Sequence, residues 1–240
     1  MSGIAENLAR ARENIQRAAM AAGRDPEKVT LVAATKTQSD DTIRQAIAAG
    51  VTVCGENRVQ ELTAHLAANA YEGAAVHFIG HLQTNKVKYV VGHAALIHSV
   101  SSEKLLLAID KQAEKLGICQ DILLEVNLAG EESKSGFAPE EALPAARLAA
   151  ELEHIRLRGL MCIPPAAEKS GENRPFFAKL RRLAVDISLE MGDNKADNLW
   201  LSMGMSGDYE DAVAEGADFV RLGTALFGPR PPLHPTAEHL

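Results

Sequence analysis

Apolar residues recur along this chain in two alternating patterns. Short runs rich in Val, Ile and Leu are typical of buried strands, and the segments between them repeat apolar residues at helical spacing. The runs predict eight strands, at 29–34, 51–54, 76–79, 95–99, 121–127, 156–162, 198–202 and 218–222. The helical spacing predicts a first helix within residues 1–23, a short last helix after Thr224, and seven helices between the strands, at 39–49, 57–69, 83–91, 103–116, 139–151, 172–191 and 208–215.

Strand and helix therefore alternate eight times, which is the pattern of a (β/α)8 TIM-type barrel with an extra N-terminal helix. Glycines that fall just past predicted helices support these boundaries, because a left-handed residue commonly ends a helix; they are Gly23, Gly50, Gly117, Gly192 and Gly216. An open, doubly wound sheet is the main competitor, and the even spacing favours the barrel. We expect one domain over 1–240, with a C-terminal tail at 229–240.

Composition narrows the function classes. The formal net charge is −7, so the chain lacks the basic footprint of a general nucleic-acid binder. No stretch is long and apolar enough to predict a membrane span, and the first helix lacks the apolar core of a signal peptide. The three cysteines form no C-x-x-C pair, which favours a reducing compartment, and we expect a cytoplasmic protein.

Lys36 is the first residue that raises a chemical question. It follows the predicted strand at 29–34 and is flanked by Thr35 and Thr37. The active sites of these barrels lie at the carboxyl ends of the strands, so an amine at this position is a candidate reactive group. The alternative is an ordinary surface lysine in a loop.

Two glycine-bearing turns follow the seventh and eighth predicted strands, at 203–207 and 223–225. Small residues there let backbone N–H groups approach an anion, and the loops after these two strands are the usual phosphate site of such barrels. Ser206 and Thr224 add a hydroxyl to each turn. The alternative is that the glycines serve only to make tight turns. The chain contains no nucleotide-binding P-loop pattern.

Arg221 lies on the eighth predicted strand, where a buried charge needs a partner. A carboxylate such as Glu125, on the fifth strand, is one candidate, and a bound ligand is the other. A lysine amine, a phosphate site and an internal arginine together indicate a phosphorylated aldehyde bound as a Schiff base. Pyridoxal 5′-phosphate (PLP) fits this combination best.

Six stretches of the chain resemble the pyridoxal phosphate homeostasis protein family, whose fold is that of the alanine racemase N-terminal domain. They run from about residue 29 to 228 and are highly specific in combination. The stretches are LVAATKTQ, GENRVQEL, HFIGHLQTNKVK, EVNLAGEESKSGF, GLMCIPP and LSMGMSGDYEDAVAEGADFVRLGTALFG.

The resemblance implies a role for each candidate residue. Lys36 would form the Schiff base, Asn57 would lie beside the cofactor, and Arg221 would face the pyridine nitrogen. The phosphate would be held by Ser206, Gly223 and Thr224. The resemblance also favours a monomer. Cys162 departs from the expected pattern, since a small or hydroxylated residue would be usual at that position.

Carrier and enzyme remain alternatives. An arginine facing the pyridine nitrogen leaves the ring unprotonated and weakens it as an electron sink. The chain stops soon after the barrel, and none of its tyrosines, Tyr71, Tyr89 and Tyr209, is an evident second base. The leading hypothesis is a protein that carries, stores or buffers PLP and that serves apo PLP-dependent enzymes. The other hypotheses are a PLP-dependent enzyme, such as a minor amino-acid racemase, and a Schiff-base aldolase.

The remaining polar residues suggest less chemistry. His77 and His81 lack the helical spacing and the third ligand of a metal site, so we predict no metal. Glu56 and Glu61 are interpreted as capping or solvated charges rather than as an acid–base pair.

Overall fold

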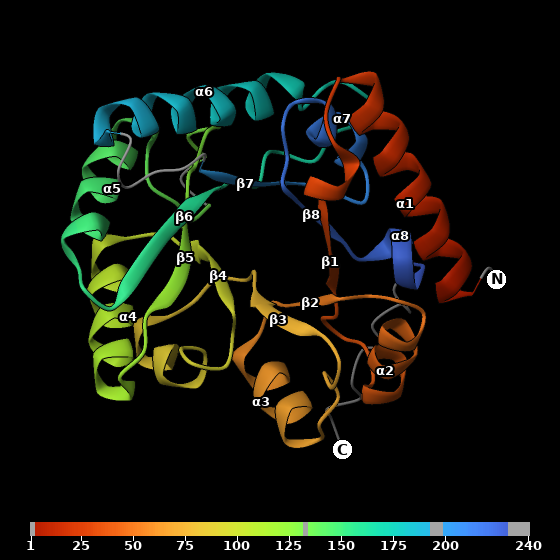
Figure 1. The fold of residues 1–240 in the computed structure, drawn as a ribbon, viewed down its shortest axis with the longest axis horizontal. Coiled ribbons are helices and arrows are strands. Elements are labelled where there is room, and N and C mark those ends of the chain that lie inside the picture. The colour runs from red at the N-terminus through yellow and green to blue at the C-terminus, as the bar shows by residue number, and fades with distance from the viewer. Residues whose placement is uncertain (1–2, 132–133, 193–198, 230–240) are drawn as a thin grey trace, which may run out of the picture.

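A closed barrel of parallel strands forms the centre of the molecule (Figure 1). The computed structural model describes residues 3–131, 134–192 and 199–229. Its eight strands are β1 Thr30–Ala34, β2 Val53–Glu56, β3 Ala75–Phe78, β4 Leu96–Val100, β5 Gln120–Glu125, β6 Ile155–Met161, β7 Trp200–Met205 and β8 Phe219–Leu222. They pair in chain order, and β1 also pairs with β8. This closure confirms the predicted (β/α)8 barrel and excludes the open sheet.

Helices cover the outside of the barrel (Figure 1). The α-helices are α1 Ile4–Ala21, α2 Asp40–Ala48, α3 Val59–Ala67, α4 Glu103–Leu116, α5 Ala142–Glu151, α6 Arg174–Met191, α7 Tyr209–Ala214 and α8 Thr224–Phe227. Three 3-10 helices are η1 Pro26–Lys28, η2 Thr84–Tyr89 and η3 Pro139–Glu141. Helix α1 precedes the first strand, as predicted, and packs against α7 and α8. Within the described ranges, no helix combines the length and apolar character that a membrane span requires.

Two apolar clusters stabilise this arrangement, and they lie on opposite faces of the barrel wall. Alternation along each strand separates them: in β1, Val32 and Ala34 face the interior and Ala33 faces the helices. Leu8 and Ile15 of α1 belong to the outer cluster. The interior cluster comprises Val32, Ala34, Val53, Ile79, Leu96, Leu123, Met161 and Phe219.

Strand β2 begins two residues later than the predicted strand at 51–54. The backbone N–H of Val51 donates to the carbonyl of Ala46 and completes the carboxyl-terminal cap of α2, so it is not available to the sheet. The shift brings Glu56 into the strand, where it is fully buried.

Two further boundaries differ from the sequence prediction. The strand predicted at 198–202 continues to Met205, which pairs with Arg221 of β8. Residue 198 lies outside the described residues, as does the predicted tail from 230 onward. The helix predicted at 83–91 is the shorter 3-10 helix η2, in which Val87 alone is buried, so little apolar surface holds that segment in a longer α-helix.

Candidate functional site

The predicted site residues lie at the carboxyl ends of four strands. Lys36 follows β1, Asn57 follows β2, Ser206 follows β7, and Gly223 follows β8, where Thr224 begins α8. Because the strands of the barrel are parallel, these ends meet at one rim. The fold therefore brings together the residues that the sequence singled out, and β1 and β8 are direct neighbours.

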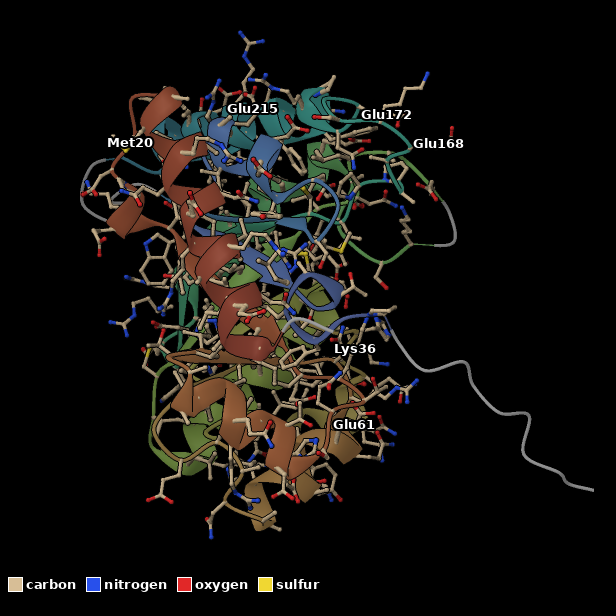
Figure 2. All side chains as sticks on the ribbon, turned by 90° about the vertical axis from the view of Figure 1, so that its right-hand side faces the viewer. Met20, Lys36, Glu61, Glu168, Glu172 and Glu215 are labelled. Carbon is tan, nitrogen blue, oxygen red and sulfur yellow. The ribbon has the colours of Figure 1, made fainter. Side chains whose placement is uncertain are left out.

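Lys36 is half-buried in the turn that connects β1 to α2. Figure 2 shows it on the same side of the barrel as Glu168 and Glu172, which lie in the segment between β6 and α6, and away from Met20 of α1. The preceding residue, Thr35, is fixed to β2, since its backbone N–H donates to the carbonyl of Gly55 at 2.9 Å and its hydroxyl donates to the carboxyl group of Glu56. These bonds anchor the start of the turn that carries the amine.

Glu56 is a buried carboxyl group, which corrects its interpretation as a capping or solvated charge. Its Oε1 accepts hydrogen bonds from the hydroxyls of Thr35 and Tyr71, the second at 2.8 Å, whereas Oε2 has no hydrogen-bond partner among the described residues. Burial raises the pKa of Glu56, and the two hydrogen bonds act in the opposite direction. The carboxyl of Glu56, the residue before Asn57, is thus hydrogen bonded to Thr35, the residue before Lys36.

The turns after β7 and β8 are joined by one side chain. The Oγ of Ser206 accepts hydrogen bonds from the backbone N–H groups of Gly223 and Ala225, at 3.2 and 3.1 Å. A Cβ added to Gly223 would make only ordinary contact, 3.7 Å from the Cβ of Ala34, and one added to Gly207 would meet nothing within 4 Å. The turn after β7 therefore borders open space at Gly207, and the side chain of Ser206 ties the turns after β7 and β8 together at the position that is usual for a phosphate site in such barrels.

Asp208 holds the turn after β7 in shape, a role that sequence reasoning missed. Its Oδ1 accepts from the backbone N–H of Met205 and its Oδ2 from the amide of Asn173, both at 2.7 Å. Gly204 makes the turn possible, since its φ is +89° and a Cβ there would lie 2.5 Å from the Cβ of Ala212. The position of an aspartate directly before a helical pattern was the available signal.

Arg221 is buried in the barrel interior and is held by two neighbouring strands. Its Nη1 donates to the Oγ of Ser202 at 2.6 Å, and its Nη2 donates to the carbonyl of Cys162 at 2.9 Å. Glu125, the carboxylate partner suggested by the sequence, makes no ion pair with it among the described residues. Burial lowers the pKa of Arg221, whereas Cys162, Glu125 and Asp208 raise it. The hydrogen-bond partners of this buried cation are thus a neutral hydroxyl and a neutral carbonyl, not a carboxylate.

Two buried histidines, His98 and His77, continue the hydrogen bonding from Ser202 across the barrel interior. The sequence analysis predicted neither the contact of Ser202 with His98 nor that of His98 with His77. Ser202 Oγ lies 2.8 Å from Nδ1 of His98, and Nε2 of His98 lies 3.0 Å from Nδ1 of His77. His81, considered with His77 as a metal pair, lies instead on an exposed loop and hydrogen bonds to Ser135 at 3.0 Å. Within the described parts of the chain, no group of three suitable side chains could hold a metal ion.

Asn57 borders a cavity of about 240 Å³ at the rim, which Ser99 and Glu125 also line. The Oδ1 of Asn57 is buried and has no hydrogen-bond partner among the described residues. The backbone here is packed closely, since a Cβ on Gly80 would lie 2.1 Å from the carbonyl oxygen of Asn57. An unpaired acceptor beside a cavity is a position at which a bound molecule would find a partner.

Cys162 is fully enclosed beside Arg221. Burial raises the pKa of its thiol to about 12, and the charge of Arg221 opposes this shift. Since the thiolate is the nucleophilic form, the thiol is unreactive at neutral pH. The unusual residue at this position therefore adds no competing nucleophile.

Comparisons with known proteins place these features in context. Residues 7–231 match the family described as "Alanine racemase, N-terminal domain". The chain is 44% identical over 225 residues to the pyridoxal phosphate homeostasis protein of Aquifex aeolicus, covering 94% of this chain and 97% of that protein. It is 43% identical over 231 residues to the protein of the same name from Pseudomonas aeruginosa, covering 96% and 97%. PipY of Synechococcus elongatus, solved with PLP bound, superposes with a TM-score of 0.82 at 35% identity, covering 94% of this chain and 100% of PipY.

Proposed function

This chain belongs to the pyridoxal phosphate homeostasis protein family, and from that premise we propose that it binds PLP through a Schiff base at Lys36. The observation that carries the proposal is that a lysine and a candidate phosphate-binding turn follow two neighbouring strands. Lys36 follows β1, and Gly223 follows the neighbouring strand β8 in a turn that Ser206 ties to the turn after β7. When bound, PLP supplies an aldehyde that reacts with a primary amine and a phosphate that accepts hydrogen bonds.

Each candidate residue then has one task. The amine of Lys36 would condense with the aldehyde of PLP, with the two amine hydrogens and the aldehyde oxygen released as water. Gly223, Ser206 and Thr224 would hold the phosphate. Arg221 would serve the pyridine nitrogen, and Asn57 would lie beside the cofactor.

The residues present fit such a ligand. Gly207 leaves open space over the turn after β7, and Oδ1 of Asn57 has no hydrogen-bond partner among the described residues and belongs to a residue that lines the rim cavity. The protonated thiol of Cys162 leaves Lys36 as the nucleophile for the aldehyde.

We propose that the protein carries, stores or buffers PLP and serves apo PLP-dependent enzymes, rather than catalysing a reaction of its own. Arg221 is a donor only, which disfavours a protonated pyridine ring. Each tyrosine is engaged elsewhere: Tyr71 donates to Glu56, Tyr209 accepts from Asn14 at 2.8 Å, and the ring of Tyr89 lies under Lys88. Because of these contacts, none of the three tyrosines is placed to act as a second base opposite Lys36.

We also propose a reducing, cytoplasmic location and a monomeric state. The three cysteines, Cys54, Cys119 and Cys162, form no disulfide, which suits a reducing compartment. The monomeric state rests on the resemblance of the sequence to the family.

The Schiff base is tested by trapping. PLP-loaded protein should be yellow, and borohydride should bleach it and fix the cofactor to Lys36, as peptide mass spectrometry would show. Lys36→Ala should lose both the colour and the trapped adduct. Lys111→Ala is a matched control, because Lys111 is exposed on α4, and it should behave as the wild type. A trapped adduct at Lys134, which lines the rim cavity, with Lys36 unmodified, would reject the assignment.

A further inference from the structure

A continuous chain of buried hydrogen bonds crosses the barrel interior from β8 to β3. It runs from Arg221 to Ser202 of β7, then to His98 of β4 and His77 of β3, with heavy-atom distances of 2.6, 2.8 and 3.0 Å. All four side chains are buried, with 7% or less of their surface exposed. The ring of Phe219 packs edge-on against both imidazoles, so the chain is bordered by apolar surface.

The hydrogen atoms in this chain have one consistent direction. A guanidinium has donors and no acceptor, so Oγ of Ser202 accepts from Arg221. The buried Ser202 hydroxyl must then donate, and the hydrogen bonds of the described residues give it no acceptor other than Nδ1 of His98. His98 therefore carries its proton on Nε2 and donates to Nδ1 of His77. Because the guanidinium of Arg221 can only donate, it sets the tautomers of both histidines.

The histidines remain neutral while they do this. Burial lowers the pKa of His77 to about 4. Burial also lowers the pKa of His98 well below its usual range, and His77 and Arg221 add to the effect. A serine that donates its own proton becomes a stronger acceptor for the guanidinium.

We infer that Ser202, His98 and His77 are positioning residues that fix the orientation and hydrogen-bond direction of the Arg221 guanidinium. With Nη1 held by Ser202 and Nη2 held by the carbonyl of Cys162, the planar group has one orientation in the interior. The inference deepens the proposed function, on which its ligand rests. In this inference, the hydrogen-bonded row from Arg221 to His77 serves to recognise a neutral aromatic nitrogen. A fixed N–H donor favours such a nitrogen, whereas a ring C–H in its place could not accept the hydrogen bond.

The first test uses the protein without PLP. Nitrogen NMR of the wild type should show both histidines neutral with the proton on Nε2, and separately resolved Nη protons for Arg221 because its rotation is hindered. Ser202→Ala should average the Arg221 signals and leave His98 as a mixture of tautomers. Ser188→Ala is the control, since this α6 serine bonds only to Ala184 of its own helix, and it should leave both signals unchanged. A wild-type His98 with its proton on Nδ1 would overturn the inference.

The second test measures affinity for PLP and for a carbocyclic analogue in which C–H replaces the ring nitrogen. The wild type should prefer PLP by about tenfold or more, the effect of one hydrogen bond to a charged group. Ser202→Ala should bind the two about equally, and Ser202→Thr, which keeps the hydroxyl, should restore the preference. An unchanged preference in Ser202→Ala would overturn the inference. Failure of the wild type to bind PLP would instead reject the proposed function, and the NMR measurement would still decide the positioning role.

Discussion

Glu56 illustrates how a single residue connects the fold to the candidate site. Its buried carboxyl binds Thr35, which precedes Lys36, and it directly precedes Asn57. Tyr71 adds a second donor to the same oxygen and leaves the other oxygen without a partner among the described residues. One hydrogen bond to Thr35 and one peptide bond to Asn57 therefore place this carboxyl next to two candidate site residues.

Glu56 predicts a dependence of stability on pH. Burial raises the folded-state pKa of this carboxyl above its unfolded value, so folding favours the protonated form. Its contribution to stability is therefore present below the ordinary glutamate pKa and declines as the pH rises through the raised value. Glu56→Gln should flatten the fall in melting temperature that begins as the pH rises above the ordinary glutamate pKa. The exposed substitution Glu72→Gln should keep the wild-type slope, and the same slope in Glu56→Gln would contradict the prediction.

At the scale of elements, the alternation of strands and helices was readable from the sequence because each element buries one face. The order of the strands also placed Lys36, Ser206 and Gly223 at one rim in advance. Boundaries were less accessible: the cap of α2 uses the N–H of Val51 and delays β2, which no apolar pattern records. The contacts of Ser202 with His98 were not predictable, since they join strands far apart in the chain and depend on side-chain packing in the closed interior.

Helix α1 is an element whose contribution can be measured. Leu8 is 2% exposed in the outer cluster, and α1 packs against α7 and α8. Leu8→Ala should lower the free energy of unfolding by about 2–5 kcal/mol, because it removes buried methyl groups and leaves a cavity. The measurement is the midpoint of denaturant unfolding, and the control is Met20→Ala on the same helix, where the side chain is 64% exposed. Equal effects of the two substitutions would show that α1 adds no stability through this packing.

For the whole molecule, the question is whether bound PLP is carried or used. The proposed place of Arg221 at the pyridine nitrogen, together with the engagement of all three tyrosines in other contacts, predicts a loaded protein that leaves amino acids unchanged. Alanine and serine in deuterated water should exchange their Cα protons no faster with the loaded protein than with PLP alone, as proton NMR would measure. Exchange well above that background in the wild type and absent in Lys36→Ala would identify an enzyme.

The pairing of β1 with β8 also affects when the site can form during synthesis. Lys36 leaves the ribosome early, whereas the turns that contain Ser206 and Gly223 leave late. At about 5–20 residues per second, roughly 10 s or more separates them. A nascent chain therefore exposes Lys36, the proposed Schiff-base lysine, before the proposed phosphate turns exist, and specific loading would await closure of the barrel. Cofactor binding would thus act on the finished molecule and would select chains that have completed folding.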